Sequence, residues 1–225
     1  MDYIIVGCGG IGARLAEPLI RQIPRDSNLT LMDGDKLEEH NFDRQMFPVE
    51  ALGEFKTKAL KKSLLQYDPN RKVRTRNSFL RIAVPPKHEE PPTLFVCVDN
   101  LAGRLAALHY ADFTGGTCII GGNELIEAEA MYYKPDWQET ARDPRVMYPN
   151  WLEDGLVDPT HSCTGEAQER HPQLALANMQ AATHMLWLWY IWENTRPELD
   201  NDASLPHHVR ANHYGHIQVN KGVAA

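Results

Sequence analysis

The segment Gly7-Cys8-Gly9-Gly10-Ile11-Gly12 restricts the possible folds of this chain more than any other part of the sequence. It follows a short apolar run, Tyr3 to Val6, which is typical of a parallel strand covered on both faces. Apolar residues then recur at helical spacing from Ala13 to Gln22, and a second apolar run, 29–32, ends at Asp33. A strand, a glycine turn, a helix and a strand with an acidic end predict the opening unit of a dinucleotide-type α/β fold.

The alternation of strands and helices continues beyond this unit. We expect two helices, at about 54–67 and 101–113, and three strands, at 72–78, 93–98 and 117–120. These elements predict an α/β fold with a doubly wound, mainly parallel, Rossmann-like sheet. Alternating apolar residues from 124 to 133 indicate a further strand in an antiparallel setting.

The last part of the chain has three features. The stretch 134–172 has no clear periodicity, and a loop of this length in a compact domain is usually functional or mobile. The apolar stretch 174–192 predicts a buried helix, and its tryptophans suggest burial on several sides or a homodimer contact. Polar side chains interrupt this stretch, so we do not expect a membrane span. A hairpin is expected to turn at 213–215.

The length of 225 residues suits one domain, and we find no boundary that divides residues 1–225 into two. We predict a nucleotide-binding core at 1–123 and a C-terminal antiparallel extension at 124–225. The 23 Lys and Arg against 30 Asp and Glu give a net charge of -7, which argues against a general nucleic-acid surface. The N-terminus has no basic segment before its apolar run, so we expect a cytoplasmic protein.

The cysteines and histidines do not form a recognisable metal motif. The four cysteines, at positions 8, 97, 118 and 163, lack Cys-x-x-Cys spacing, so we expect neither a structural zinc nor a disulfide framework. Cys97 and Cys118 lie in apolar strands and are expected in the core. Four histidines near the C-terminus have no partner at metal-site spacing, and we expect them at the surface: His207, His208, His213 and His216.

The glycine turn alone does not show which kind of nucleotide the chain binds. Gly7, Gly9 and Gly12 fit the G-x-G-x-x-G pattern, in which main-chain N–H groups and a helix N-terminus approach a phosphate. Asp33 could hydrogen-bond the ribose of a dinucleotide or of a mononucleotide. An NAD-dependent oxidoreductase is therefore one alternative.

A polar, cationic group follows the second strand and favours a triphosphate. It comprises Asn41, Arg44, Gln45 and Lys56. Two positive charges beside the glycine turn suit ATP better than a dinucleotide, although Lys56 could also be a solvated charge on a lysine-rich helix. Asp99, at the end of another strand, offers an oxygen ligand for Mg²⁺, or alternatively the N-cap of the next helix.

With these residues the chain resembles the ThiF/MoeB-type adenylating enzymes, which are related to the ubiquitin-activating enzymes. The resembling segments occur in family order over nearly the whole chain: 7–12, Asp33-x-Asp35, Asn41-x-x-Arg44-Gln45, Gly53-x-x-Lys56, Asp99-Asn100 with Arg104, Gly121-Gly122, and Ser162-Cys163. The region from Tyr148 through the apolar helix is similar to compact ThiF-like proteins of bacterial mobile elements, phages and plasmids.

The resemblance implies an enzyme that uses Mg-ATP to adenylate the C-terminal carboxylate of a ubiquitin-like protein, usually ending in Gly-Gly, or of a peptide. It implies that Asp33 holds the ribose, that Arg44 and Lys56 bind the phosphates, and that Asp99 coordinates Mg²⁺. The remaining nucleotide-site positions implied are Gly7, Gly9, Gly10, Gly12, Asn41, Gln45 and Asn100.

Cys163 stands where sulfur-transfer members of the family carry a cysteine that takes over the acyl group. His161, two residues away, is a candidate base for its thiol. Other similar enzymes keep a cysteine here and release the adenylate without using it, so both roles stay open.

Three departures from the family pattern bear on activity. The zinc-binding Cys-x-x-Cys pairs are missing, and Cys97 stands where many members have an acidic residue. The sequence also starts at the first strand, without the N-terminal helices that in several relatives deliver an arginine to the phosphates. A non-catalytic partner-binding module is therefore a further alternative to the enzyme.

Overall fold

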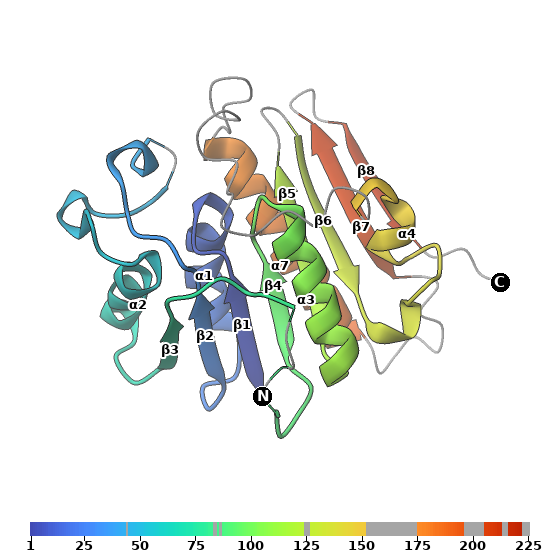
Figure 1. Cartoon of the computed structure of the whole chain (residues 1–225), viewed down its shortest axis with the longest axis horizontal. Coiled ribbons are helices and arrows are strands. Elements are labelled where there is room, and N and C mark those ends of the chain that lie inside the picture. The colour runs from blue at the N-terminus through green and yellow to red at the C-terminus, as the bar shows by residue number, and fades with distance from the viewer. Residues whose placement is uncertain are drawn as a thin grey trace.

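A mostly parallel sheet forms the centre of the computed structural model, which describes residues 1–43, 45–82, 85, 87–123, 127–151, 175–195, 205–212 and 216–221 (Figure 1). Within these ranges the sheet has eight strands. In spatial order they are β3 (Lys72–Arg76), β2 (Asn28–Met32), β1 (Asp2–Val6), β4 (Thr93–Val96), β5 (Thr117–Asn123), β6 (Glu127–Tyr133), β7 (Pro206–Asn212) and β8 (Ile217–Lys221).

The direction of the strands changes between β5 and β6. The five strands from β3 to β5 are parallel, and the pairs β5–β6, β6–β7 and β7–β8 are antiparallel. Ile5 of β1 is in register with Leu31 of β2 and with Phe95 of β4. The predicted α/β fold with an antiparallel C-terminal extension is therefore confirmed.

The order of the strands reverses at β1. From β1 the chain builds β2 and β3 on one side, and then crosses to β4 and β5 on the other. Ligands of open α/β sheets bind at such a switch point, beyond the carboxyl ends of the strands. The glycine turn follows β1 directly and therefore lies at this point.

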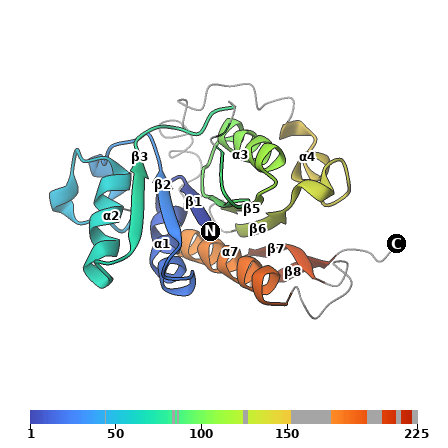
Figure 2. The same cartoon turned by 90° about the horizontal axis from the view of Figure 1, so that it is seen from below.

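Helices cover both faces of the sheet (Figure 2). Helices α1 (Gly10–Gln22) and α7 (Ala175–Thr195) lie side by side on one face, while α3 (Leu101–Thr114) packs on β4 and β5 from the other. Helix α2 (Lys56–Tyr67) packs beside β3. The short helix α4 (Pro144–Met147) and the 3-10 turn Pro135–Trp137 lie in the stretch without periodicity. Two further 3-10 turns, Glu39–Asn41 and Val49–Ala51, lie between β2 and α2. None of the described helices is long and apolar enough to cross a membrane.

The core lies on both faces of the sheet, under α1 and α7 on one face and under α3 on the other. All four residues of β4 are buried, as expected for a central parallel strand. Trp189 of α7 packs edge-on against Tyr3 and Phe95, and Trp192 stacks on Tyr132 with ring centroids 4.6 Å apart. Trp187 points the other way and is 59% exposed. The helix is thus buried along one side and carries exposed apolar side chains along the other.

The prediction that His207 and His208 lie at the surface is wrong. Both are buried, because β7 is an interior strand between β6 and β8 and both faces of the sheet are covered at these two residues. The ring of His207 packs against Trp137, and that of His208 meets Glu129. His216 is exposed as predicted, and His213 lies outside the described residues. Cys97 and Cys118 are buried in the core, as predicted.

Candidate functional site

The glycine turn requires glycine for steric reasons. Gly7 has φ +90°, and a Cβ atom there would lie 2.9 Å from the carbonyl carbon of Cys97. A Cβ atom on Gly12 would lie 1.9 Å from the Gly7 carbonyl oxygen. Helix α1 starts at Gly10, and its N-cap residue is Gly9. Among the described residues, no side-chain hydrogen bond caps this end of the helix. Main-chain N–H groups at the start of α1 therefore form a cradle for an anion.

Asp33 ties the end of β2 to this turn. Its carboxylate accepts hydrogen bonds from the Cys8 N–H at 2.7 Å and from the Asp35 N–H at 2.8 Å. Burial raises the pKa of Asp33, and the nearby charge of Lys56 opposes that rise. The sequence placed Asp33 at the nucleotide site, and the structure brings it into direct contact with the glycine turn.

Lys56 is not a solvated charge. It is the first residue of α2, its side chain is 8% exposed, and its Nζ lies 2.8 Å from Asp35 Oδ2. Its main-chain N–H also donates to the Asp35 carbonyl oxygen. By contrast, Lys62 on the same helix is 67% exposed and pairs with Glu54. The structure thus separates one buried lysine from its solvated neighbours and holds it beside the end of β2.

Asn41 and Gln45 are both buried but have different surroundings. The Asn41 side chain accepts a hydrogen bond from the Glu38 N–H at 3.1 Å and so shapes its own loop. The Gln45 side chain reaches the glycine turn, with Nε2 3.6 Å from the position of a Cβ on Gly9. Gln45 Oε1 is buried without a hydrogen-bond partner among the described residues. Arg44, between them, lies outside the described residues.

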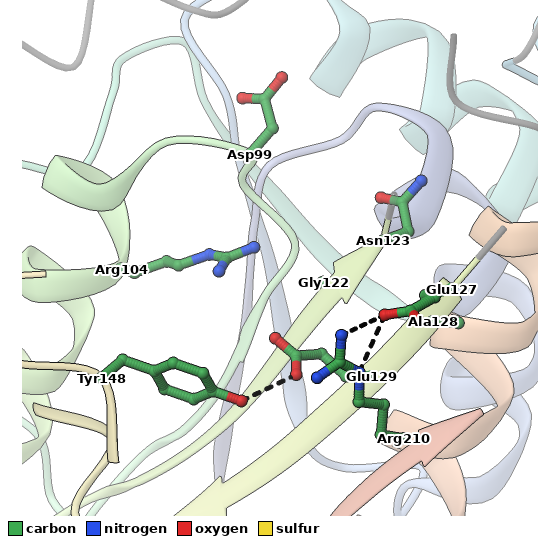
Figure 3. Close-up of a pocket in the computed structure, with 9 residues that line it drawn as sticks. All are labelled: Asp99, Arg104, Gly122, Asn123, Glu127, Ala128, Glu129, Tyr148 and Arg210. Carbon is green, nitrogen blue, oxygen red and sulfur yellow. Dashed lines mark hydrogen bonds and ion pairs between the residues drawn. The ribbon is translucent and has the colours of Figure 1, made fainter. Parts of the chain in front are cut away.

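The sequence left open whether Asp99 binds Mg²⁺ or caps the following helix, α3. The Asn100 side chain caps α3 by accepting a hydrogen bond from the Gly103 N–H at 2.7 Å. Asp99 is exposed and stands just beyond β4, on the rim of a pocket (Figure 3). The cap is therefore Asn100, and the Asp99 carboxylate remains available to a ligand.

The pocket beside Asp99 has a volume of about 300 Å³ and a polar, charged lining. Its lining residues are Asp99, Arg104, Gly122, Asn123, Glu127, Ala128, Glu129, Tyr148 and Arg210. Arg210 of β7 lies opposite Glu129 in the register and forms a diagonal ion pair with Glu127 of β6 (Figure 3). Sequence reasoning named Asp99, Arg104, Gly122 and Tyr148 of this set. The alternation along 124–133 could have put Glu127 and Glu129 on one face, but it did not reveal their partners.

Glu129 is held at the pocket by two neighbours. Its Oε2 accepts a hydrogen bond from the Tyr148 hydroxyl at 3.1 Å and meets His208 Nε2 at 3.3 Å. The Asn220 amide nitrogen lies 3.0 Å from His208 Nδ1, and since that amide can only donate, Nε2 carries the imidazole proton. Burial would raise the pKa of Glu129, but the His208 hydrogen bond and the Arg104 charge outweigh it and lower the pKa. Glu129 is therefore an anion at neutral pH.

Arg104 supplies a positive charge opposite Glu129. Its Nε donates to the Val98 carbonyl oxygen at 3.3 Å, and its guanidinium lies 5.3 Å from the ring centroid of Trp151. A Cβ atom on Gly122 would lie 3.1 Å from Arg104 Nη2 and 3.2 Å from Glu129 Oε1. Glycine at 122 thus lets these two groups approach each other.

None of the three cysteines in the described ranges resembles an activated nucleophile. Cys8, Cys97 and Cys118 are buried, and burial raises the pKa of each thiol. Cys163 lies outside the described residues. The described residues also contain no group of three or more His, Cys, Asp or Glu that could hold a metal ion by themselves.

Comparison with solved structures identifies proteins of the same fold. The structure of PaaA matches with a TM-score of 0.67 and 18% identity, over 100% of this chain and 64% of PaaA. The structure of Escherichia coli MccB with ATP matches with a TM-score of 0.68 and 18% identity, over 98% of this chain and 63% of MccB. That of MccB with AMPCPP and MccA gives a TM-score of 0.70, 18% identity and the same coverage.

The chain spans less than two thirds of the length of these solved chains. No protein of curated function matches it significantly by sequence. The family model for ThiF, however, matches residues 1–185, which include the glycine turn, Asp33, Lys56, Asp99 and the first half of α7. The chain belongs to the ThiF family.

Proposed function

We propose that this chain uses Mg-ATP to adenylate the C-terminal carboxylate of a peptide or small protein. The observation that carries the proposal is the position of two sites at one edge of the sheet. The anion cradle at α1, with Asp33 and the buried Lys56, lies at the carboxyl ends of β1 and β2, and the charged pocket begins at Asp99, just beyond β4. Adenylation needs these two sites side by side, because a carboxylate must reach a bound nucleotide.

The proposed reaction joins two anions. A carboxylate oxygen of the substrate attacks the α-phosphorus of ATP, and the bond from that phosphorus to pyrophosphate breaks. Lys56, Arg44 and the N–H groups of α1 bind the phosphates and offset the charge that develops there. Asp33 accepts a hydrogen bond from the ribose, and Asn100 fixes the start of α3 behind Asp99.

The residues at Asp99 fit a Mg²⁺ ion that is shared with the nucleotide. A single exposed carboxylate beside a phosphate cradle is the ligand set that Mg²⁺ prefers, since it keeps several waters and phosphate oxygens. When bound there, Mg²⁺ would offset the negative charge of the phosphates.

The pocket supports a substrate that ends in a carboxylate. Arg104 presents a guanidinium to it, and the substrate tail would lie along β6 between Arg104 and Tyr148. In this proposal the 1–123 core binds the nucleotide and the 124–225 extension binds the tail. MccB has been crystallised with the MccA peptide, and this supports a peptide as the substrate class. A Gly-Gly-ended, ubiquitin-like protein is the second substrate class in this proposal, and it rests on the family resemblance alone.

A transfer to Cys163 completes the proposed sequence of reactions. The Cys163 thiolate attacks the acyl carbon of the adenylate, the C–O bond to AMP breaks, and a thioester forms. The burial of Cys8, Cys97 and Cys118 supports this assignment, because it leaves Cys163 as the cysteine to test. Mass spectrometry of a turnover mixture should find an acyl adduct that disappears in Cys163→Ser, and an adduct that persists in this variant would refute the step.

We also propose a homodimer through the outer side of α7. Four apolar side chains on this side are exposed: Leu176 (72%), Met179 (51%), Trp187 (59%) and Tyr190 (46%). Their spacing places them along one stripe of the helix. Sedimentation equilibrium should give a dimer that dissociates in Trp187→Glu, whereas a monomeric wild type would exclude the dimer.

Calorimetry tests the nucleotide assignment directly. Wild-type protein should bind Mg-ATP and not NAD, and Arg44→Ala should weaken Mg-ATP binding. Binding of NAD that is insensitive to Arg44→Ala would instead favour the oxidoreductase.

A further inference from the structure

Asn178 of α7 lies against the glycine turn, although it is far from the turn in sequence. Its side chain contacts Gly10, the first residue of α1: a Cβ atom on Gly10 would lie 2.5 Å from Asn178 Nδ2. An alanine at position 10 would therefore collide with this amide. Gly10 is glycine because the amide of a second helix lies on it.

The Asn178 amide is buried and lacks a hydrogen bond that it should have. The residue is 1% exposed, and Nδ2 has no hydrogen-bond partner among the described residues. Buried amide groups in native proteins are nearly always hydrogen-bonded, so an unpartnered donor at this position needs an explanation.

A second buried side-chain amide lies on the neighbouring glycine, although the atom that it leaves unpartnered is an acceptor and cannot itself bond a phosphate oxygen. Gln45, 7% exposed, reaches the position of a Cβ on Gly9, and its Oε1 also lacks a partner within the described ranges. Two buried side-chain amides, from a loop and from α7, thus flank the N-terminus of a 13-residue helix. Helix N-termini attract anions, and each Asn178 N–H can donate to a phosphate oxygen.

We infer that Asn178 donates a hydrogen bond to a phosphate oxygen of the bound nucleotide. The inference rests on the proposed function, and it adds a residue from α7 to a phosphate site otherwise built from α1, α2 and the loop after β2. It also explains why residue 10 is glycine, because a side chain there would keep the Asn178 amide of α7 from the start of α1.

Calorimetric titration with Mg-ATP and with adenosine tests this inference. Asn178→Asp keeps the size of the side chain, replaces the donor by an acceptor and adds a negative charge. We expect it to weaken Mg-ATP binding at least tenfold and to leave adenosine binding unchanged. Asn178→Ala removes the whole amide without adding a charge and should show a smaller loss of the same selectivity. Asn194→Asp is the matched control, because Asn194 is an exposed residue near the other end of α7.

The outcomes separate this inference from the proposed function. Equal ratios of Mg-ATP to adenosine affinity in wild type and in both Asn178 variants would overturn the role of Asn178, while ATP binding itself would stand. A wild type that binds no Mg-ATP would overturn the proposed function and this inference with it. Thermal unfolding without nucleotide identifies a purely structural role, which would lower Tm and leave the affinity ratio unchanged.

Discussion

Lys56 Nζ lies 2.8 Å from Asp35 Oδ2, and this ion pair joins the first turn of α2 to the loop that follows β2. The lysine side chain is 8% exposed and the aspartate side chain 35% exposed. The charge on Lys56 is thus turned toward the end of the sheet where the glycine turn and Asp33 also lie. A phosphate in the cradle of α1 would meet a cation that is already oriented.

Replacement of this cation should remove activity and leave the fold intact. We expect Lys56→Met to lower the rate of pyrophosphate–ATP exchange by about a hundredfold, because a preoriented charge at the phosphates is lost. Methionine retains most of the buried methylene chain, so Tm should change little. Lys62→Met, which removes an exposed lysine from the same helix, should retain the wild-type rate. Equal losses in both variants would refute a special role for Lys56.

The glycine turn should tolerate no side chain at Gly12. A Cβ there would lie 1.9 Å from the Gly7 oxygen, so we expect Gly12→Ala to destabilise the protein by about 2 kcal/mol or more. Gly53 has φ +81° but no atom of the described residues within 4 Å of its Cβ position, so Gly53→Ala should cost only the backbone strain, about 1 kcal/mol. Urea unfolding measures both, and a larger loss in Gly53→Ala would contradict the steric account.

The contribution of Glu129 to stability should depend on pH. Its pKa is lowered in the folded protein, so its stabilising effect is present above the ordinary value of 4.5 and disappears as the pH falls through the lower folded value. Glu129→Gln should therefore destabilise the protein at pH 7, by roughly 1–3 kcal/mol for lost charged hydrogen bonds. Urea unfolding at several pH values should show the difference from wild type shrinking in acid. A difference that grows in acid would be inconsistent with an ionised Glu129.

The pocket should be sensitive to a single methyl group. We expect Gly122→Ala to displace Arg104 and Glu129, because its Cβ would lie 3.1 Å and 3.2 Å from their side chains. The KM for the carboxylate substrate should rise about tenfold while Mg-ATP affinity stays the same. If instead the variant lost Mg-ATP affinity and kept substrate KM, the pocket would belong to the nucleotide and not to the tail.

Much of the parallel half could be predicted from the sequence. The strands β1 and β4 are short apolar runs, as at Leu94 and Phe95, and each is followed by a turn residue or an acidic end. Such patterns involve residues that are adjacent in the sequence, so the strands can be predicted from them. Asp33 was predicted at the nucleotide site on the same grounds, and the structure adds its hydrogen bond to Cys8.

The remaining contacts depend on pairings between distant segments. Glu129 meets His208 only because β6 pairs with β7, and it meets Tyr148 only because the end of α4 lies against β6. The sequence reveals neither arrangement. From the sequence alone His208 was predicted at the surface, because the interior position of β7 in the sheet was not known. The contact of Asn178 with Gly10 likewise depends on α7 packing beside α1, which helical periodicity alone cannot predict.

Pyrophosphate–ATP exchange with a pool of short peptides of randomised C-terminal residues tests the central claim most directly. The pool is used once with free C-terminal carboxylates and once with C-terminal amides, which cannot be adenylated. We predict exchange that requires Mg²⁺, occurs with the free acids alone and is lost in Lys56→Met. Equal exchange with acids and amides, or none with any free acid in a protein that binds Mg-ATP, would contradict the assignment as a carboxylate-adenylating enzyme.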